Sequence, residues 1–567
     1  MNSHIFFIGL RRLRGPLILM VVIFATAIAG LVLIPGVDAD GREWHMSFSQ
    51  ALYFMSYTAT TIGFGEIPYE FTDPQRLWVT GMIFGSVIGW AYLVASLLAL
   101  ARDQGFRGAV TAARFARAVR GMREPFYLIC GFGETGRLVG RALDRLGYRF
   151  TVIDIDRARI QELSIMNLAQ DAPAMVADAR FPDNLVAAGL QASECAGVLA
   201  LTNNEQANLA VAMSVRLLNP HTPVLARAMS DDIIANMDSF DTDHVINPFA
   251  RFGQYFALAL HSPGSYRLIS WLTGLPGTTL EQETAPPHGH WLVCGYGRFG
   301  CEVVDALREE SMQVCVIDPE DVRISGAKTV KGIGTEAEPL IEAGVRDAVG
   351  IVAGTDDDIT NLSIAVTARE LNENLFTVVR QNLQANRALF EAFDADITVV
   401  STEIAANECL TLIRTPRLTN FLAVVREKES AWAEQAIVRL QAALGQPSPE
   451  IWSVSISPAG APALHRSIKY EGCKFSLGDL SRNPASRDDR LDMVALNLTR
   501  DGKSDAFPDD DSTLESGDQI LYAGTSRARR AQWPLLRNLN VCYYVVSGVD
   551  PSGGWIWQQF RRKASGG

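Results

Sequence analysis

The sequence predicts an α-helical membrane domain, followed by two Rossmann-like α/β domains and a C-terminal α+β lobe. Three observations lead to this prediction: two long apolar runs without charge, a glycine-containing stretch between them, and a strand, glycine turn and helix pattern that occurs twice further on. The chain has 567 residues, too many for one hydrophobic core, so several domains are expected.

The apolar runs cover residues 15–36 and 77–101. At about 1.5 Å per residue, each is long enough to cross the roughly 30 Å apolar core of a bilayer. The first run is too long for a signal peptide and lacks a small-residue cleavage pattern, and a second span follows it. Arginines are concentrated before the first run and over residues 102–124, so the positive-inside rule predicts that both termini are cytoplasmic.

The stretch between the runs has two parts. Residues 46–60 are aromatic, rich in Ser and Thr, and too short to span, which predicts a half-helix that dips into the membrane. Irregular backbone at that depth is tolerated only along a water-filled path. The next five residues can aim successive carbonyl oxygens at one axis, where four chains would replace the water shell of a potassium ion. These residues are Thr61, Ile62, Gly63, Phe64 and Gly65.

This membrane domain resembles the two-transmembrane potassium channel family, specifically its prokaryotic ligand-gated members. The usual filter is TVGYG followed by Asp, whereas this chain has Ile62, Phe64 and Glu66 at the variable positions. The change to Ile is harmless. Phe64 lacks a hydroxyl that could brace the filter from behind, and the longer Glu66 is expected to change that bracing. The resemblance implies a potassium-selective pore in a prokaryotic inner (cell) membrane.

The second apolar run carries residues suited to a hinge and a gate. Gly85 and Gly89 each permit a bend, and Gly89, Leu93 and Leu97 recur at helical spacing. In this class of channel the lower inner helix lines the cytoplasmic mouth. The resemblance therefore implies that Leu97, or its neighbour Leu93, is part of a hydrophobic constriction. The alternative is that Leu97 faces lipid.

The rest of the chain contains an internal duplication. Gly131 matches Gly295 at an offset of 164 residues, and further on Thr202 matches Thr355 at an offset of 153. Each copy reads as strand, GxGxxG turn, helix and a second strand ending in Asp, the context in which this motif binds a pyrophosphate at a helix N-terminus. A carboxylate at that Asp accepts bonds from ribose hydroxyls, which favours NAD or an adenosine nucleotide over NADP.

The predicted nucleotide-binding residues fall into two corresponding sets. In the first copy they are Gly131, Gly133, Glu134, Thr135, Gly136, Asp154, Asp178, Thr202 and Arg227. In the second copy they are Gly295, Gly297, Arg298, Phe299, Gly300, Asp318, Thr355 and Arg380. Either copy can also keep the fold without binding a ligand.

The two copies differ at several of these positions. Asp178 aligns with Ile333, and Arg298 stands inside the glycine loop of the second copy, where it either pairs with a phosphate or is solvated. The run 356–358 is acidic in the second copy only; it either helps to bind a divalent cation, at a spacing unlike that of a calcium loop, or forms a solvated turn.

The copies resemble the RCK domain (regulator of potassium conductance, of the KTN or TrkA-N type), and residues 449–533 resemble the C-terminal lobe of that family. The resemblance implies a homotetramer whose eight RCK domains form a gating ring, without enzymatic activity, regulated by NAD, NADH, ADP, ATP or calcium. The predicted divisions are a pore domain (1–101), a gating linker (102–124), a first RCK domain (125–263), a linker (264–290), a second RCK domain with a helical extension (291–448), a C-terminal lobe (449–547) and a tail (548–567).

Composition and two alternatives bound this interpretation. A net charge of −12 gives no reason to expect nucleic-acid binding, and eight cysteines without a CxxC pair predict reduced, buried thiols. A membrane-tethered NAD-dependent oxidoreductase would explain the glycine motifs but not the filter, and no catalytic constellation is evident. A regulatory subunit of a potassium uptake transporter has such duplicated domains but lacks pore helices.

Overall fold

The computed structural model describes residues 2–274 and 285–548. The chain divides into two compact units. One unit contains residues 1–123 with 173–175 and 185–192, and the other contains the remainder. Part of the predicted linker (275–284) and the predicted tail from residue 549 lie outside the described residues.

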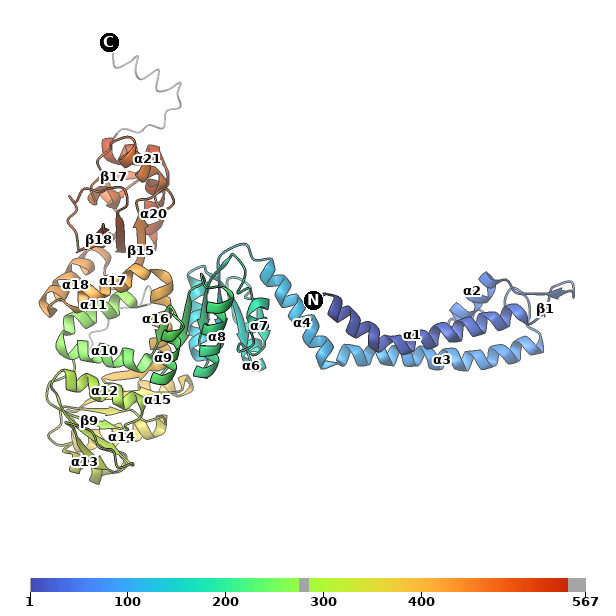
Figure 1. Cartoon of the computed structure of the whole chain (residues 1–567), viewed down its shortest axis with the longest axis horizontal. Helices are drawn as coiled ribbons and strands as arrows, with labels where there is room; N and C mark the ends of the chain where they lie inside the picture. Colours follow the sequence, from blue (N-terminus) through green and yellow to red (C-terminus); the bar gives the residue numbers. More distant parts are fainter. Residues whose placement is uncertain (1, 275–284, 549–567) are drawn as a thin grey trace, which may run out of the picture. The chain divides into compact units, whose positions relative to one another are not determined.

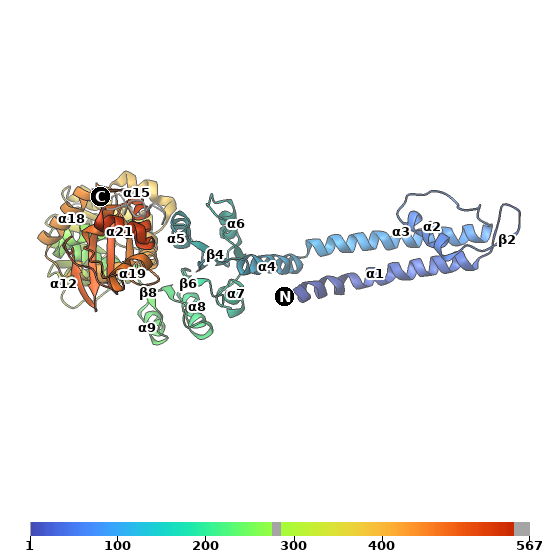
Figure 2. The same cartoon turned by 90° about the horizontal axis from the view of Figure 1, so that it is seen from above.

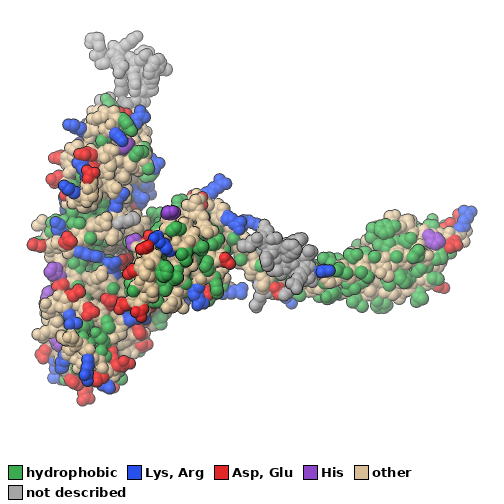
Figure 3. All heavy atoms as spheres, viewed as in Figure 1, with side chains coloured by type: hydrophobic (Ala, Val, Ile, Leu, Met, Phe, Trp, Pro, Cys, Tyr) green, Lys and Arg blue, Asp and Glu red, His purple; other side chains and the backbone are tan. Residues whose placement is uncertain are grey.

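Two long helices, α1 (Asn2–Leu33) and α3 (Asp73–Arg102), lie side by side (Figures 1 and 2). Over Leu13–Leu33 and Asp73–Arg102 they are long and apolar enough to cross a membrane. Hydrophobic side chains cover this pair of helices in Figure 3, as expected of a surface that faces lipid. Helix α1 ends at Leu33 because Pro35 disfavours helical backbone at the residue before it.

The predicted half-helix is α2 (Phe48–Ala59). It begins where Ser47 and Gln50 form a capping box, in which each side chain accepts a bond from the other residue's backbone N–H. Phe54 and Met55 of α2 are buried in one apolar cluster with Leu31 of α1, so the half-helix is anchored to the first span. A two-stranded hairpin, β1 (Gly36–Val37) and β2 (Glu43–Trp44), precedes it.

The predicted gating linker is mostly one helix, α4 (Gln104–Arg120). Asp103 caps it by accepting a hydrogen bond from the Phe106 N–H at 2.9 Å. Phe115 and Val119 are buried, whereas Arg114 is exposed, so the helix is amphipathic. Helix α4 is therefore packed along one face and is not exposed to solvent on all sides.

The first α/β domain contains a six-stranded parallel sheet in the order β5-β4-β3-β6-β7-β8. Its strands are β3 (Phe126–Cys130), β4 (Arg149–Asp154), β5 (Ala174–Val176), β6 (Cys195–Ala200), β7 (Val224–Arg227) and β8 (His244–Ile246). Its helices are α5 (Glu134–Arg145), α6 (Arg157–Ile165), α7 (Pro182–Ala187), α8 (Glu205–Leu218) and α9 (Asp231–Ser239). The central strands are buried on both faces, which explains their continuous apolar sequences.

The second α/β domain repeats the sheet in the order β11-β10-β9-β12-β13-β14. Its strands are β9 (His290–Cys294), β10 (Gln313–Asp318), β11 (Lys328–Lys331), β12 (Gly350–Ala353), β13 (Phe376–Gln381) and β14 (Ile397–Val400). Its helices are α12 (Arg298–Glu309), α13 (Ala337–Ala343), α14 (Asp358–Leu371) and α15 (Arg387–Phe393). Residues 319–327, all described, contain no helix where the first domain has α6. This shorter connection explains why the repeat offset falls from 164 to 153 residues.

The two α/β domains exchange their last helices. Helix α10 (Pro248–His261), which follows the first sheet, packs against α12 of the second domain. Helix α16 (Ser401–Arg414), which follows the second sheet, packs against α5 of the first. A Cβ at Gly253 would lie 2.9 Å from the Glu302 carbonyl oxygen, so glycine permits the close approach of α10 to α12.

The predicted linker over 264–290 needs correction, because its first part is helix α11 (Pro263–Thr273). Pro263 occupies the first turn, where a missing N–H costs nothing, so proline here starts a helix. Trp271 is fully buried and its Nε1 donates to the Gln446 carbonyl at 3.1 Å. Helix α11 shares an apolar core with α17 (Pro416–Arg426) and α18 (Ser430–Leu444), the predicted helical extension.

The C-terminal lobe is α+β, as predicted. Its antiparallel sheet has the order β15-β20-β18-β19. The strands are β15 (Glu450–Ser455), β18 (Met493–Arg500), β19 (Lys503–Ala506) and β20 (Gln519–Gly524), with a separate pair β16 (Arg482–Asn483) and β17 (Ser486–Arg490). The helices are α19 (Pro462–Lys469), α20 (Ser526–Arg537) and α21 (Leu539–Ser547), which share one core with the sheet.

Candidate functional site

The backbone that follows α2 alternates in handedness. Thr61, Gly63 and Gly65 have φ angles of 62°, 67° and 95°, whereas Ile62 and Phe64 between them do not have positive φ. Alternating left- and right-handed residues turn successive carbonyls to the same side of the chain. A Cβ on Gly63 or Gly65 would meet no atom within 4 Å, so the dihedral and not crowding requires glycine there.

The predicted gate residues all lie on one uninterrupted helix, α3. Gly89 has a packing role: a Cβ there would lie 2.7 Å from Ile23 Cδ1 and 3.1 Å from Met20 Sδ, both on α1. Small residues allow such close helix approach in membranes. A Cβ at Gly85 would lie 3.9 Å from Ile23 Cγ2, an ordinary contact distance, and Leu97 is 46% exposed in the single chain.

A pocket lies beside the glycine loop of the first α/β domain, at the carboxyl ends of β3, β4 and β6. Its volume is about 500 Å³, including its open mouth. Four predicted residues line it: Gly131, Asp154, Asp178 and Thr202. Three further charged or polar side chains do so without having been predicted: Arg159, Arg180 and Asn204. The carboxyl edge of a parallel sheet is where such folds bind ligands.

Two glycines give this loop its compact form. Gly131 has φ +97°, and a Cβ there would lie 2.8 Å from the Thr202 backbone nitrogen. A Cβ at Gly136 would lie 2.2 Å from the Gly131 carbonyl oxygen, so only glycine lets α5 start this close to the loop. A Cβ at Gly133 would lie 3.6 Å from Arg159, an ordinary contact.

Asp154 at the end of β4 is 4% exposed and braces the loop. Its Oδ2 accepts the Phe132 N–H at 2.5 Å and its Oδ1 accepts the Asp156 N–H at 2.7 Å. Asp318 in the second domain accepts the Tyr296 N–H at 2.7 Å and the Glu320 N–H at 2.9 Å. In the first domain Arg159 Nη1 adds an ion pair to Asp154 at 3.3 Å. A carboxylate has about four acceptor positions, so Asp154 can still accept from a ribose hydroxyl.

Asp178 faces the same pocket and is paired with Arg180. The Nη2 of Arg180 lies 2.7 Å from Asp178 Oδ2, and this hydrogen bond holds the pKa of Asp178 below its usual range. The pocket therefore presents both signs of charge at neutral pH. Sequence reasoning found the two carboxylates but missed Arg159 and Arg180. Their closeness in sequence to those acids, five and two residues on, was the available signal.

The acidic run of the second domain is used by the fold. Asp356 accepts from Arg380 Nη1 at 2.8 Å, and Asp357 caps α14 by accepting the Thr360 N–H at 2.7 Å. Asp358 is 4% exposed and accepts the Asn382 N–H at 2.5 Å. No group of three or more His, Cys, Asp or Glu able to hold a metal ion is found among the residues that the structure describes. The calcium site stays a prediction.

The helices that follow the two glycine loops begin with a residue that contacts the other domain. Arg298 Nη1 donates to Glu205 Oε1 at 2.7 Å, while its side chain remains about half exposed. Glu134 Oε1 accepts the Gln384 N–H at 3.1 Å. Burial alone would raise the pKa of Glu205, but the N–H groups of Met229 and Ser230 and the Arg298 guanidinium outweigh it and lower that pKa.

Other predicted site residues lie outside the pocket. Arg227 is 7% exposed and donates to Asn203 Oδ1 at 3.1 Å, and Arg380 is 8% exposed beneath the Phe249 ring, 4.7 Å from its centroid. Burial lowers the pKa of both guanidinium groups. Thr135 and Phe299 are almost fully buried. Thr355 repeats the role of Thr202, each bonding through its hydroxyl to an Asn side chain, Asn361 or Asn208.

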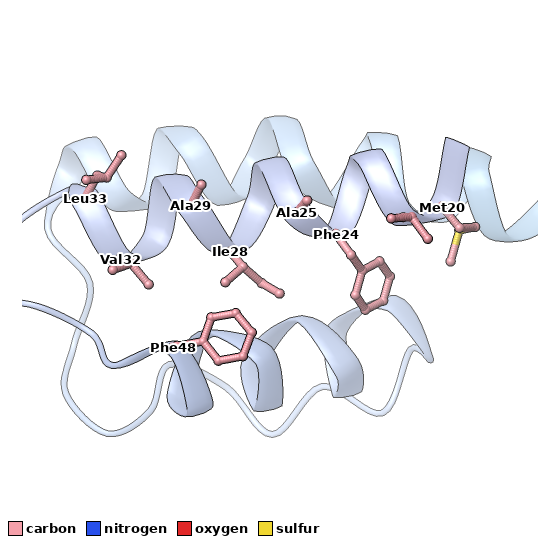
Figure 4. A pocket seen from close by; sticks show the side chains of 9 residues that line it. Met20, Phe24, Ala25, Ile28, Ala29, Val32, Leu33 and Phe48 are labelled. Carbon is pink, nitrogen blue, oxygen red and sulfur yellow. The ribbon is translucent and has the colours of Figure 1, made fainter. Parts of the chain in front are cut away.

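A larger groove, of about 1350 Å³ including its open side, belongs to the membrane segments. It runs along α1 and is closed at one side by Phe48 of α2 (Figure 4). Every residue that lines it is apolar, including Phe24, Ile28 and Val32. A nucleotide would find no polar partner there, so this groove is a surface for lipid or protein.

Comparison with known families agrees with this geometry. The ion channel profile matches residues 17–103, and the TrkA-N domain profile matches residues 127–248 and 291–401. Together these matches cover more than half of the chain. The chain belongs to the ion channels that carry two TrkA-N domains. The resemblance to such channels, the fold class and a membrane location are thereby confirmed for this tandem TrkA-N channel.

Relatives of the tandem TrkA-N channel are found in archaea. An uncharacterized protein of Methanothermus fervidus is 26% identical over 242 residues, which are 42% of this chain and 36% of that protein. Potassium channel protein 1 of Methanocaldococcus jannaschii is 21% identical over 42% of this chain and 68% of its own length. Probable potassium channel protein 2 of that organism is 24% identical over 47% of this chain and 74% of its own length. The chain thus spans about a third of the first relative.

Solved structures to which the chain is similar include the GsuK channel. The two chains are 17% identical, and the match covers 92% of this chain and 98% of the GsuK chain, with a TM-score of 0.48. The GsuK channel bound to NAD has a TM-score of 0.46 at 17% identity, and the match covers 93% of this chain and 98% of that chain. GsuK bound to ADP has a TM-score of 0.44 at 20% identity, and the match covers 73% of this chain and 99% of that chain.

Proposed function

We propose that the tandem TrkA-N channel conducts potassium ions and that nucleotide binding to its TrkA-N domains controls opening. The observation that carries the proposal is the alternating backbone of residues 61–65 between two membrane-length helices, in a chain that also has a charged pocket beside a glycine loop. The first feature suits a dehydrated cation and the second a nucleotide. The names of the two Methanocaldococcus relatives agree with potassium as the ion.

The filter requires four copies of the chain. One chain supplies one strand of carbonyls from residues 61–65, and a potassium ion needs oxygens on all sides. A cyclic homotetramer meets this need and brings eight TrkA-N domains together, which we propose form a gating ring. By the distribution of arginine, both termini are on the cytoplasmic side of a prokaryotic cell membrane.

The first TrkA-N domain is the better nucleotide site. Asp154 is positioned to accept from a ribose hydroxyl, and the amide groups at the start of α5 suit phosphates. Arg159 and Arg180 bring positive charge to a pocket whose two carboxylates alone would repel an anion. The ligand class is therefore NAD, NADH, ADP or ATP. The second domain has Ile333, 49% exposed, where the first has Asp178.

Nucleotide shifts gating only if it binds the open and closed states with different affinity. A tenfold preference is worth about 1.4 kcal/mol per site. Four such sites would supply about 5.6 kcal/mol, close to the ~5.5 kcal/mol that moves a population from 1:99 to 99:1. Helix α4 joins α3 to the first strand of the first TrkA-N domain and is the covalent route for this change.

We place the gate at the cytoplasmic end of α3. Leu97 is 46% exposed in the single chain, so its side chain is free to meet its copies near the axis. Leu97→Asp should hold the pore open, because four carboxylates would hydrate and repel one another. An open probability equal to that of the wild type would assign Leu97 to the lipid face.

Two other functions fit less well. Trk system potassium uptake protein TrkA homologues, such as that of Pyrococcus horikoshii (28% identical over 23% of this chain), match the TrkA-N region, but a regulatory subunit would not need two spans and a filter backbone. An oxidoreductase would need catalytic groups beside a nicotinamide, and we assign no enzymatic activity.

Single-channel recording of the purified protein in a planar bilayer, under a potassium/sodium gradient, tests the proposal. NAD, NADH, ADP, ATP and calcium are added in turn to the side of the TrkA-N domains. We expect a reversal potential near the potassium value and an open probability that responds to at least one nucleotide. Selective current that ignores every ligand would refute nucleotide control, and absence of current would refute the channel.

A further inference from the structure

The filter backbone has two positions that no side chain of their own can support. Gly63 and Gly65 have no side chain, and space around both is open within the single chain. Three positive φ angles within five residues must nevertheless be maintained, one of them at Thr61, where a side chain disfavours it. Hydrogen bonds from outside the strand must therefore hold the carbonyl directions.

Tyr57 of α2 makes one such bond. Its Oη donates to the Gly65 carbonyl oxygen at 2.6 Å, joining the half-helix to the outer end of the filter. The Tyr57 side chain is 4% exposed, and its ring meets those of Tyr53, Phe54 and Phe64 edge-on at 5.3–5.4 Å. A ring held on three sides fixes where its hydroxyl points, so this donor is preorganised.

Glu66 makes the second support, immediately after the filter. Its Oε1 and Oε2 accept from Arg76 Nε and Nη2, each at 3.0 Å, and Oε2 accepts the Phe71 N–H at 2.8 Å. Arg76 stands in the first turns of α3, so this bidentate pair ties the end of the filter to the second span. The outer end of the filter is thus held from both neighbouring helices.

We propose that Tyr57 is the positioning residue that sets the Gly65 carbonyl, taking over the bracing hydroxyl that Phe64 lacks. The inference rests on the proposed potassium pore and extends it to the determinant of selectivity. Without the Tyr57 hydroxyl, the Gly65 carbonyl loses the hydrogen bond that joins it to the half-helix and can rotate. The rings around site 57 remain packed if only the oxygen is removed.

Tyr57→Phe in the full-length channel tests this, because it removes one oxygen and keeps the ring cluster. The measurement is the potassium-to-sodium permeability ratio from reversal potentials in planar bilayers. We expect the ratio to fall by at least about fivefold, roughly 1 kcal/mol and the size of one buried hydrogen bond. Tyr69→Phe is the matched control, since Tyr69 lies in the loop between the filter and α3 with its ring against Trp44; its ratio should stay within about twofold of wild type.

The outcomes separate this inference from the proposed function. A wild-type channel without potassium selectivity overturns both. A selective wild type with an equally selective Tyr57→Phe variant overturns the role of Tyr57 alone. Thermal stability of the detergent-solubilised oligomer in potassium and in sodium provides a second readout that needs no current. Potassium should stabilise the wild type more than the variant, and equal stabilisation of the two would also overturn the role.

Discussion

The two TrkA-N domains share a sheet order and a glycine loop, but they differ in what surrounds the loop. In both domains the aspartate at the end of the second strand accepts a backbone N–H from the loop, Asp154 from Phe132 and Asp318 from Tyr296. The first domain adds two arginines, each paired with an acid at the pocket. We therefore propose that the motif and its acid maintain the fold in both domains, and that the flanking charges make the first domain the ligand site.

The largest effect is expected from a carboxylate placed against the phosphates. Gly131→Asp should weaken NAD and ADP binding to the full-length channel by at least about 100-fold, or ~2.7 kcal/mol, because the new side chain adds repulsion and crowds Thr202. Gly295→Asp, the matched change in the second domain, should alter affinity by less than about threefold. Isothermal titration calorimetry measures both. Equal losses would show that the domains bind alike.

The next largest effect is expected at a position where the two domains differ, Asp178 in the first and Ile333 in the second. Asp178→Ile gives the first domain the residue of the second and leaves Arg180 without its partner in the pocket. We expect about tenfold weaker nucleotide binding, or ~1.4 kcal/mol, in the same titration, because the acceptor oxygens of Asp178 are lost and Arg180 is no longer held at the pocket. Ile333→Ala is the control in the second domain and should leave affinity unchanged. An Asp178→Ile variant that binds as wild type would remove Asp178 from the site.

The contact between the domains should have a smaller effect. Arg298→Ala removes the 2.7 Å bond to Glu205, but Arg298 is half exposed, so we expect a loss of only about 1 kcal/mol. The melting temperature of the two TrkA-N domains should fall by about 2–4 °C. Arg323→Ala, an exposed arginine in the connection from β10 to β11, serves as control and should shift it by less than about 1 °C. A larger shift in the control would contradict a specific role for Arg298.

The smallest effect expected is a change in the stability of the TrkA-N domains at acidic pH. The folded-state pKa of Glu205 is lowered, so its contribution to stability is complete above the unfolded value of about 4.3 and is lost as pH falls through the folded value. The stability difference between wild type and Arg298→Ala should be constant from about pH 8 to 5 and shrink below about pH 4. Thermal unfolding as a function of pH measures this, and Glu205→Gln should abolish the dependence. A difference that shrinks already near pH 6 would implicate another group.

Much of the fold and part of the site could be predicted, for reasons visible in particular elements. The spans, the half-helix and the duplication depend on local composition and periodicity, which a sequence displays directly. For the acidic run 356–358, the sequence did not distinguish a cation site from a solvated turn. Its hydrogen-bond partners, such as Arg380 and Asn382, lie more than 20 residues further along the chain. The predicted linker (264–290) was wrong over residues 264–273, which form helix α11, because a proline such as Pro263 starts helices as well as loops.

By itself, the sequence determined that two apolar helices flank a glycine-rich filter and that a nucleotide-type domain follows twice. Residue spacing is enough for this, since hydrophobic length, glycine dihedrals and strand–helix alternation are local properties. Only the tertiary structure decided that α10 and α16 exchange between the domains, that Arg298 meets Glu205, and that Tyr57 supports Gly65. Such contacts depend on how rigid elements pack, and packing joins residues whose separation in sequence carries no signal.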